Sequence, residues 1–164
     1  DKDERSFIQQ PQEHREKIVE EGLSFLHAVL EGKRVVLVDD SIVRGTNIRK
    51  IIQGMKNVGT KEVHVRIGCP PLIAPCYLGI DMRSKKEFIA RNNDGNIKTS
   101  DKIAQEIGAD SLGYISIQGL KKAIGFEVCK GCIDFPDGYP PEMQEDVKKL
   151  FKNDKKGIRA YECI

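Results

Sequence analysis

The residues of this sequence best suited to chemistry are two adjacent carboxylates followed by a short polar loop. Asp39 and Asp40 come directly after four apolar residues in the stretch 35–47, VVLVDDSIVRGTN. Unpaired N–H groups of such a loop, and of a helix that follows it, form a ready site for an anion. The loop residues that add side-chain donors or backbone freedom are Ser41, Gly45, Thr46 and Asn47.

Together these residue types favour a sugar phosphate as ligand. The loop would take the phosphate, and the two carboxylates would accept hydrogen bonds from vicinal hydroxyl groups of the sugar. Two other functions remain open, because acidic residues at strand ends also bind Mg²⁺ and also accept phosphoryl groups in signalling domains of doubly wound fold. A strand, a loop with one glycine and a helix also occur together without any function.

The elements that must position this loop form a βαβ unit. Residues 35–38 are β-branched and apolar, which predicts a strand buried on both faces, as parallel sheets require. The apolar spacing of 46–58 predicts a helix, and the alternation of 62–67 predicts the next strand. In an open parallel sheet, ligands bind beyond the carboxyl ends of the strands, where Asp39 and Asp40 are expected.

The rest of the chain adds elements of the same α/β kind. We expect a helix over 100–107, capped by Ser100 and ended by Gly108, and a short strand over 112–116. Residues 125–141 are rich in Gly, Pro and Cys and predict a loop. Further helices are predicted at 12–29, 87–90, 118–124 and 142–153.

Composition narrows the function classes. The 164 residues carry 27 Lys+Arg against 25 Asp+Glu, a net charge of +2, and no Trp, which argues against a nucleic-acid binder. No apolar run approaches the length of a membrane span, and no signal-peptide pattern opens the chain. The odd cysteine count of 5 indicates a reducing compartment, so a cytoplasmic location is expected.

The stretch VDDSIVRGT resembles the phosphoribosylpyrophosphate (PRPP) motif of type I phosphoribosyltransferases, and of amidophosphoribosyltransferases in particular. The resemblance extends over about residues 5–140 in the order and spacing of that family. It implies a type I phosphoribosyltransferase-like parallel sheet flanked by helices. The blocks that carry it are RSFIQ (5–9), EGKRVVLVDDSIVRGT (31–46), CPPLIAPCYLGID (69–81), EFIA (87–90), IGADSLGYISIQGL (107–120) and CKGC (129–132).

The resemblance implies that Asp39 and Asp40 bind the ribose hydroxyls of PRPP, with Mg²⁺ carried on the pyrophosphate. It leaves Arg5 and Arg15 as candidate basic residues to meet the pyrophosphate, with Arg5 as the predicted catalytic residue. The implied product is 5-phosphoribosylamine, made with ammonia from glutamine in the first step of purine synthesis. The residues implied to surround the 5-phosphate are Ser41, Ile42, Val43, Arg44, Gly45, Thr46 and Asn47.

One position separates this family from base-salvage relatives. Purine-salvage enzymes carry an acid three positions after the second carboxylate, which handles the proton of the base nitrogen. Val43 stands there in this sequence. Ammonia needs no such partner, although orotate-type relatives also lack the acid.

The CxxC pair Cys129 and Cys132, taken alone, is compatible with zinc, an iron–sulfur cluster, a redox pair or two ordinary thiols. The resemblance implies that these two residues and Cys76 are three of the four ligands of a [4Fe–4S] cluster in the intact parent. The fourth ligand would lie upstream of this sequence.

The resemblance further implies the C-terminal third of a longer protein. Its glutaminase domain and pyrophosphate loop are not part of this sequence, and residues 1–141 would be a partial transferase domain followed by a helix and tail at 142–164. Purine nucleotides and a second copy of the chain are the other implied partners. Because Glu20, Gly22 and His27 replace basic residues of the family, a non-catalytic PRPP- or nucleotide-binding regulatory paralogue is the alternative.

Overall fold

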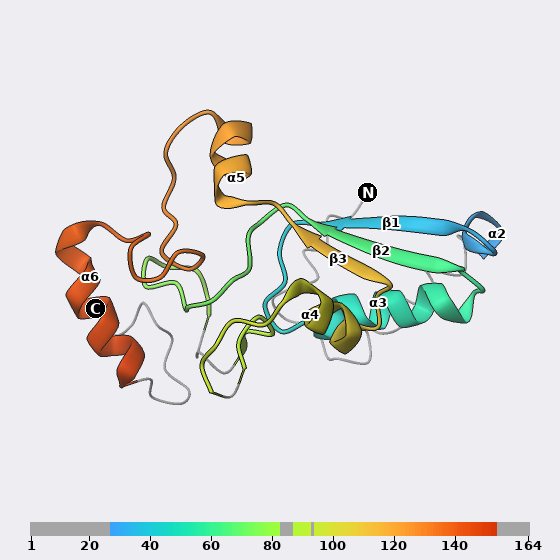
Figure 1. The fold of residues 1–164 in the computed structure, drawn as a ribbon, viewed down its shortest axis with the longest axis horizontal. Coiled ribbons are helices and arrows are strands. Elements are labelled where there is room, and N and C mark those ends of the chain that lie inside the picture. The colour runs from blue at the N-terminus through green and yellow to red at the C-terminus, as the bar shows by residue number, and fades with distance from the viewer. Residues whose placement is uncertain (1–26, 83–86, 93, 154–164) are drawn as a thin grey trace, which may run out of the picture.

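A three-stranded parallel sheet forms the centre of the structure, a computed structural model that describes residues 27–82, 87–92 and 94–153 (Figure 1). The strands β1 (Arg34–Asp39), β2 (Glu62–Ile67) and β3 (Ser111–Tyr114) lie in the order β1-β2-β3. All pairs are parallel, so the three carboxyl ends lie at one edge of the sheet.

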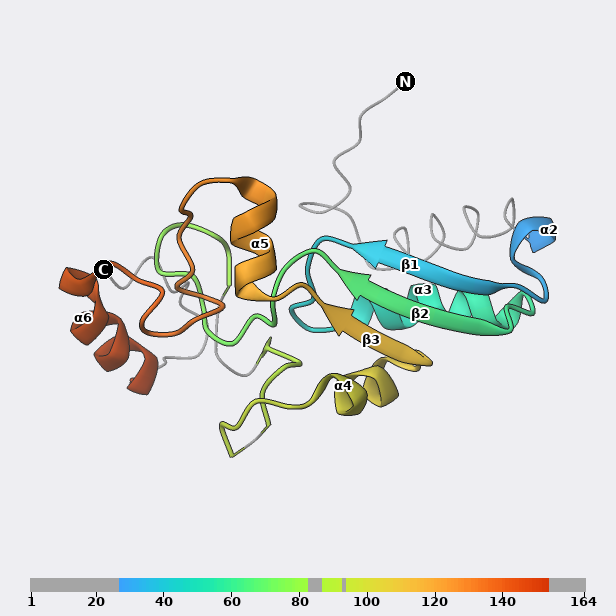
Figure 2. The ribbon, with the colours of Figure 1, turned by 45° about the horizontal axis from the view of Figure 1, so that its top comes forward.

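Two helices, α3 (Thr46–Asn57) and α4 (Ser100–Ile107), connect the strands and cover the same face of the sheet (Figures 1 and 2). This follows from the strand order, because both crossovers run in the same direction across the sheet. Right-handed crossovers that run in one direction place their helices on one face.

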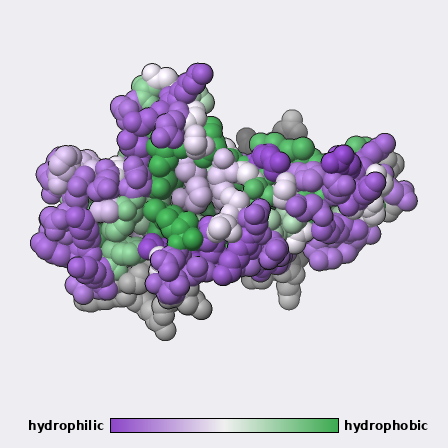
Figure 3. All heavy atoms as spheres, viewed as in Figure 1, coloured by the Kyte–Doolittle hydropathy of each residue, from purple (hydrophilic) through white to green (hydrophobic). Residues whose placement is uncertain are grey.

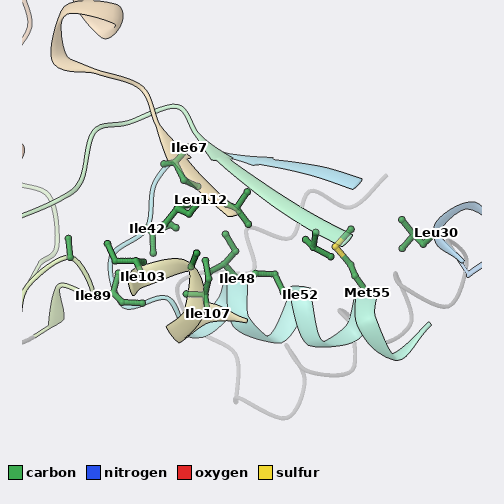
Figure 4. Close-up of a cluster of buried hydrophobic side chains, with 14 residues drawn as sticks. Leu30, Ile42, Ile48, Ile52, Met55, Ile67, Ile89, Ile103, Ile107 and Leu112 are labelled. Carbon is green, nitrogen blue, oxygen red and sulfur yellow. The ribbon is translucent and has the colours of Figure 1, made fainter. Parts of the chain in front are cut away.

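The largest hydrophobic cluster fills the space between the sheet and these two helices (Figure 4). Strand β2 is central and turns alternate side chains toward the helices, as its burial pattern shows. Contact between α3 and α4 completes the layer, because the buried side chains of both helices belong to the same cluster. The buried residues contributed by α3, β2, α4 and β3 are Ile48, Ile52, Met55, Val63, Val65, Ile67, Ile103, Ala104, Ile107 and Leu112.

Much of the rest of the described chain packs beyond the carboxyl ends of the strands, around two smaller clusters. One cluster brings together Leu72, Cys76 and Phe88 with side chains of α5 (Ile117–Ile124). The other joins Tyr77 and Tyr139 to α6 (Pro141–Lys152). A single turn of helix, α2 (His27–Leu30), precedes β1.

Most of the predicted elements are confirmed. The strand at 62–67 and the helix at 100–107 have the predicted bounds, and the helices at 46–58, 118–124 and 142–153 differ by one residue at their ends. The strand at 112–116 is displaced by one or two residues, and 125–141 is a loop up to Pro141. Of the predicted helix at 12–29, only residues 27–29 lie among the described residues.

Three details of the prediction were wrong. Strand β1 is not buried on both faces: Val36 is 59% and Val38 72% exposed, because α3 and α4 both cover the opposite face. The cap of α4 is Thr99, whose hydroxyl accepts from the Lys102 amide, so Ser100 is the first helical residue. Within 87–90 only Glu87 is helical, in a 3₁₀ conformation, whereas Ile89 and Ala90 form a turn.

The surface seen in Figure 3 is mainly hydrophilic, with apolar residues gathered near its middle. No helix within the described ranges is long and apolar enough to cross a membrane.

The main cluster predicts a clear contrast between two isoleucines. Ile103 is fully buried in it, whereas Ile97 is 55% exposed. Ile103→Ala should lower the free energy of unfolding by about 2–5 kcal/mol, since it leaves a cavity. The matched control Ile97→Ala should change it by less than about 0.5 kcal/mol in urea titrations followed by circular dichroism. Equal losses for the two variants would contradict the packing described.

Candidate functional site

The last residues of the three strands lie side by side at one edge of the sheet. Asp39 is the partner of Ile67 in the sheet, and Ile67 is the partner of Tyr114. Asp39 therefore lies at the carboxyl edge of the sheet, as predicted, with its neighbours on the edge supplied by β2 and β3. Ligands of open parallel sheets bind at such an edge.

The two carboxylates are oriented by the backbone that follows them. Oδ1 of Asp39 accepts from the Asp40 amide at 2.9 Å, and Oδ1 of Asp40 accepts from the Ser41 amide at 2.6 Å. The Ser41 hydroxyl donates to the same Asp40 oxygen at 3.3 Å. Asp40 is exposed and Asp39 is half-buried, so the pair borders solvent just past the strand. This arrangement suits hydroxyl donors of a bound ligand.

Gly45 sets the path of the loop into α3. It caps the helix at φ 74°, in the left-handed region, and no side chain caps the N-terminal amides of α3. A Cβ built on Gly45 would lie 2.5 Å from Cδ1 of Ile89 and 3.3 Å from Cγ2 of Ile107. The loop is thus pressed onto the core at this point. Main-chain amides at the start of α3 are left for solvent or an anion.

The other loop residues divide between the interior and the surface. Ile42 is buried in the main cluster, and Val43 packs against the second cluster. Arg44 forms an ion pair with Glu87, while Thr46 and Asn47 are exposed beside Gly45. The structure therefore brings Asp39, Asp40 and the whole loop together, with the polar side chains facing outward.

Two residues that sequence reasoning did not assign to the site lie close to it. Cys69 follows β2, and burial together with the nearby Asp40 carboxylate raises the pKa of its thiol. Tyr114 ends β3, and burial together with Cys69 raises the pKa of its phenol to about 12. The Tyr114 hydroxyl is buried without a hydrogen-bond partner in the described structure. Both residues could have been found from the rule that parallel strands end at one edge.

The predicted iron–sulfur cysteines lie on two adjoining segments. The carbonyl of Cys132 accepts from the amides of Ile73 and Ala74, so the CxxC loop runs beside the segment that carries Cys76. Cys76 is buried and Cys129 exposed. Burial, with smaller contributions from Cys76 and Cys69, raises the pKa of the Cys132 thiol to about 11, so it is a neutral thiol at pH 7.

These thiols do not form a metal site as they stand. Among the described residues, no three His, Cys, Asp or Glu side chains converge as the ligands of a metal would. A [4Fe–4S] cluster takes four thiolates, one more than the three predicted here. Arg5, the predicted catalytic residue, lies outside the described residues.

The sequence was compared with known proteins. No protein-family model matches it. It is 53% identical over 140 residues to the amidophosphoribosyltransferase of Methanocaldococcus jannaschii, covering 85% of this chain and 28% of that protein. With the amidophosphoribosyltransferase of Bacillus subtilis it shares 44% identity over 148 residues, 87% of this chain and 30% of that protein. The chain thus spans about three tenths of these relatives.

The fold matches solved structures as well. One is glutamine PRPP amidotransferase from B. subtilis complexed with ADP and GMP, with a TM-score of 0.59 and 37% identity over 84% of this chain and 30% of that one. Another is described as the allosteric regulatory enzyme of purine biosynthesis, with a TM-score of 0.55 and 36% identity over 88% of this chain and 32% of that one. The predicted fold class is confirmed.

Gly45 and Gly32 form a matched pair for testing the loop. Both have a left-handed φ, 74° and 68°, but a Cβ on Gly32 would meet nothing within 4 Å. Gly32→Ala should lose about 1 kcal/mol of unfolding free energy from backbone strain alone. Gly45→Ala should lose at least about 1 kcal/mol more, because the new methyl group overlaps Ile89. Equal losses in urea denaturation would show that the loop is not pressed against Ile89.

Proposed function

Since this chain is a homologue of one segment of the amidophosphoribosyltransferases, we propose that it is the PRPP-binding part of such an enzyme. The reaction would form 5-phosphoribosylamine from PRPP and glutamine-derived ammonia, the first step of purine synthesis. One observation carries the proposal: the Asp39–Asp40 pair ends β1 and is followed directly by an anion-suited loop that enters α3.

The proposed contacts follow from the chemistry of the groups at the sheet edge. Asp39 and Asp40 accept hydrogen bonds from the ribose 2- and 3-hydroxyls. Residues 41–47 surround the 5-phosphate, with main-chain amides at the uncapped start of α3 donating to its oxygens. Thr46 and Asn47, both exposed there, add side-chain donors. The carboxylates are set back from the phosphate, which avoids placing like charges together.

The surroundings of Val43 favour ammonia as the nucleophile. The nitrogen lone pair attacks C1 of the ribose, the bond from C1 to the pyrophosphate oxygen breaks, and pyrophosphate leaves with that electron pair. The ammonium group formed on C1 then gives up one proton to solvent. A purine base would need an acceptor for its proton at the position of Val43. That side chain packs against an apolar cluster instead. The chain's contribution is then to position PRPP and stabilise the charge that develops.

Other groups complete the proposal. Mg²⁺ would enter as part of the PRPP substrate complex and would supply positive charge to offset that of the leaving pyrophosphate. Arg5 meets the pyrophosphate. Purine nucleotides bind as regulators, as suggested by the B. subtilis relative that was solved with ADP and GMP. We expect the working enzyme to be a cytoplasmic homo-oligomer with a glutaminase domain.

In a longer parent chain, we further propose that Cys76, Cys129 and Cys132 contribute three ligands to a [4Fe–4S] cluster. The adjoining segments that carry them support this assignment. The fourth thiolate would come from outside this sequence, and some rearrangement of the three would be required. The proposed transfer reaction contains no redox step, so the cluster would be structural or regulatory.

The proposal predicts PRPP binding that depends on the carboxylate pair. Calorimetric titration of the full chain with PRPP and Mg²⁺ should give saturable binding. Asp39→Asn/Asp40→Asn should weaken it by more than about tenfold, because hydrogen bonds to charged groups contribute about 1.5–3 kcal/mol each. Asn keeps the size and one carbonyl oxygen, so the loop geometry should survive the change.

Asp146→Asn is the matched control, since Asp146 is a solvent-exposed carboxylate on α6 that pairs with Lys149 at 3.1 Å. It should leave the affinity for PRPP unchanged. If the double variant binds as tightly as the wild type, Asp39 and Asp40 do not hold the ribose and the proposal fails. In the longer parent chain, saturable binding without pyrophosphate release on adding ammonia would favour the regulatory paralogue, which the changed residues Glu20, Gly22 and His27 suggest.

A further inference from the structure

Arg44 lies in the middle of the proposed phosphate loop, and its guanidinium forms an ion pair with a residue that is distant in the sequence. Its Nε and Nη2 atoms donate to the same oxygen of Glu87, Oε2, at 3.1 and 2.6 Å. The Arg44 side chain is 57% exposed, but that of Glu87 is only 19% exposed. The carboxylate is therefore held mostly out of solvent beside the guanidinium.

Two further contacts fasten the same segment to the same loop. The amide of Ile89 donates to the carbonyl of Val43 at 2.7 Å. The side chain of Ile89 fills the space beside Gly45, where a Cβ would meet it. Three consecutive loop residues are thus held by residues 87–89: one through the main chain, one through an ion pair and one through apolar contact.

The holding segment is itself anchored in the rest of the structure. Phe88 is buried in the second hydrophobic cluster. Arg91 donates to the carbonyl of Ile73 at 2.8 Å, and its guanidinium lies 5.0 Å from the centre of the Phe151 ring on α6. These contacts make residues 87–91 a fixed support rather than a free loop end.

We infer that Arg44 is a positioning residue for the phosphate loop and does not itself bind the phosphate. The inference rests on the proposed function and refines it, since Arg44 was grouped there with the residues around the 5-phosphate. Its positive charge is already paired with Glu87. The ion pair holds residues 43–45 in the shape that presents the main-chain amides of α3, so less ordering is needed when the ligand binds.

The two roles of Arg44 predict opposite patterns in a double-mutant cycle. If Arg44 positions the loop, Arg44→Ala, Glu87→Ala and the double variant should all weaken PRPP binding by a similar factor, about two- to fivefold, as expected for an ion pair near the surface. If Arg44 binds the phosphate directly, Arg44→Ala should cost more than about tenfold. Glu87→Ala should then leave the affinity unchanged or raise it.

Exchanging the charges separates the roles further. Arg44→Glu/Glu87→Arg keeps the pair but would place a carboxylate against the phosphate if residue 44 faced it. Positioning predicts that this exchange restores most of the affinity lost in Arg44→Ala. Arg34→Ala is the matched control. It breaks the Arg34–Glu62 pair, 2.7 Å long, at the other end of β1, and should leave the affinity unchanged.

Amide hydrogen exchange of the ligand-free chain provides a readout that does not depend on PRPP. Exchange at residues 42–47 and at Ile89 should become faster by a similar factor in Arg44→Ala and in Glu87→Ala, and should not change in Arg34→Ala. Unchanged exchange in the first two variants would overturn the inference whatever the titrations give. A large loss of PRPP affinity in Arg44→Ala but not in Glu87→Ala would also overturn the inference. The same holds if Arg44→Glu/Glu87→Arg abolishes PRPP binding. A wild-type chain that does not bind PRPP would refute the proposed function, and the exchange comparison would then decide the positioning role alone.

Discussion

The candidate site depends on the left-handed backbone of Gly45 and on the lack of space beside it. The chain must reverse direction in the few residues between the end of β1 and the start of α3, because α3 packs against the sheet to which β1 belongs. Gly45 makes that turn at φ 74°, with Ile89 and Ile107 against the position that a Cβ would occupy. A residue with a side chain would be strained in its backbone and would also collide with the core. The orientation of the amides at the start of α3, and hence any anion site there, follows from this one contact.

Periodicity was sufficient to predict the parts of the fold in which one face is buried and the other is not. Strand β2 alternates strictly, and its predicted bounds are those of the structure. The burial of β1 was predicted wrongly. Its run of apolar residues is typical of a strand covered on both faces, but Val36 and Val38 lie on the face that α3 and α4 leave open. The direction of the two crossovers decides which face of the sheet the helices cover. The pattern of residues within one strand carries no information on that direction.

The residues of the site that are contiguous in the sequence could be predicted, but the contacts that they make with distant residues could not. Asp39, Asp40 and the loop up to Asn47 are contiguous, so the strand–loop–helix pattern is enough to place them. The pairing of Arg44 with Glu87 joins residues that are 43 positions apart, and no spacing rule connects them. Cys69 and Tyr114 reach the edge only because the three strands end in register. The segment 87–90 was also predicted as a helix, which hid its role as a support for the loop.

The most direct test of the account is to locate the phosphate on the loop. Two-dimensional ¹H–¹⁵N NMR spectra of the full chain should be recorded during titration with PRPP and Mg²⁺. The largest amide shifts should fall within residues 41–47, greatest at the start of α3, with no shift along α6. Saturable shifts that centre elsewhere, with the loop amides unmoved, would contradict the assignment of this loop as the phosphate site.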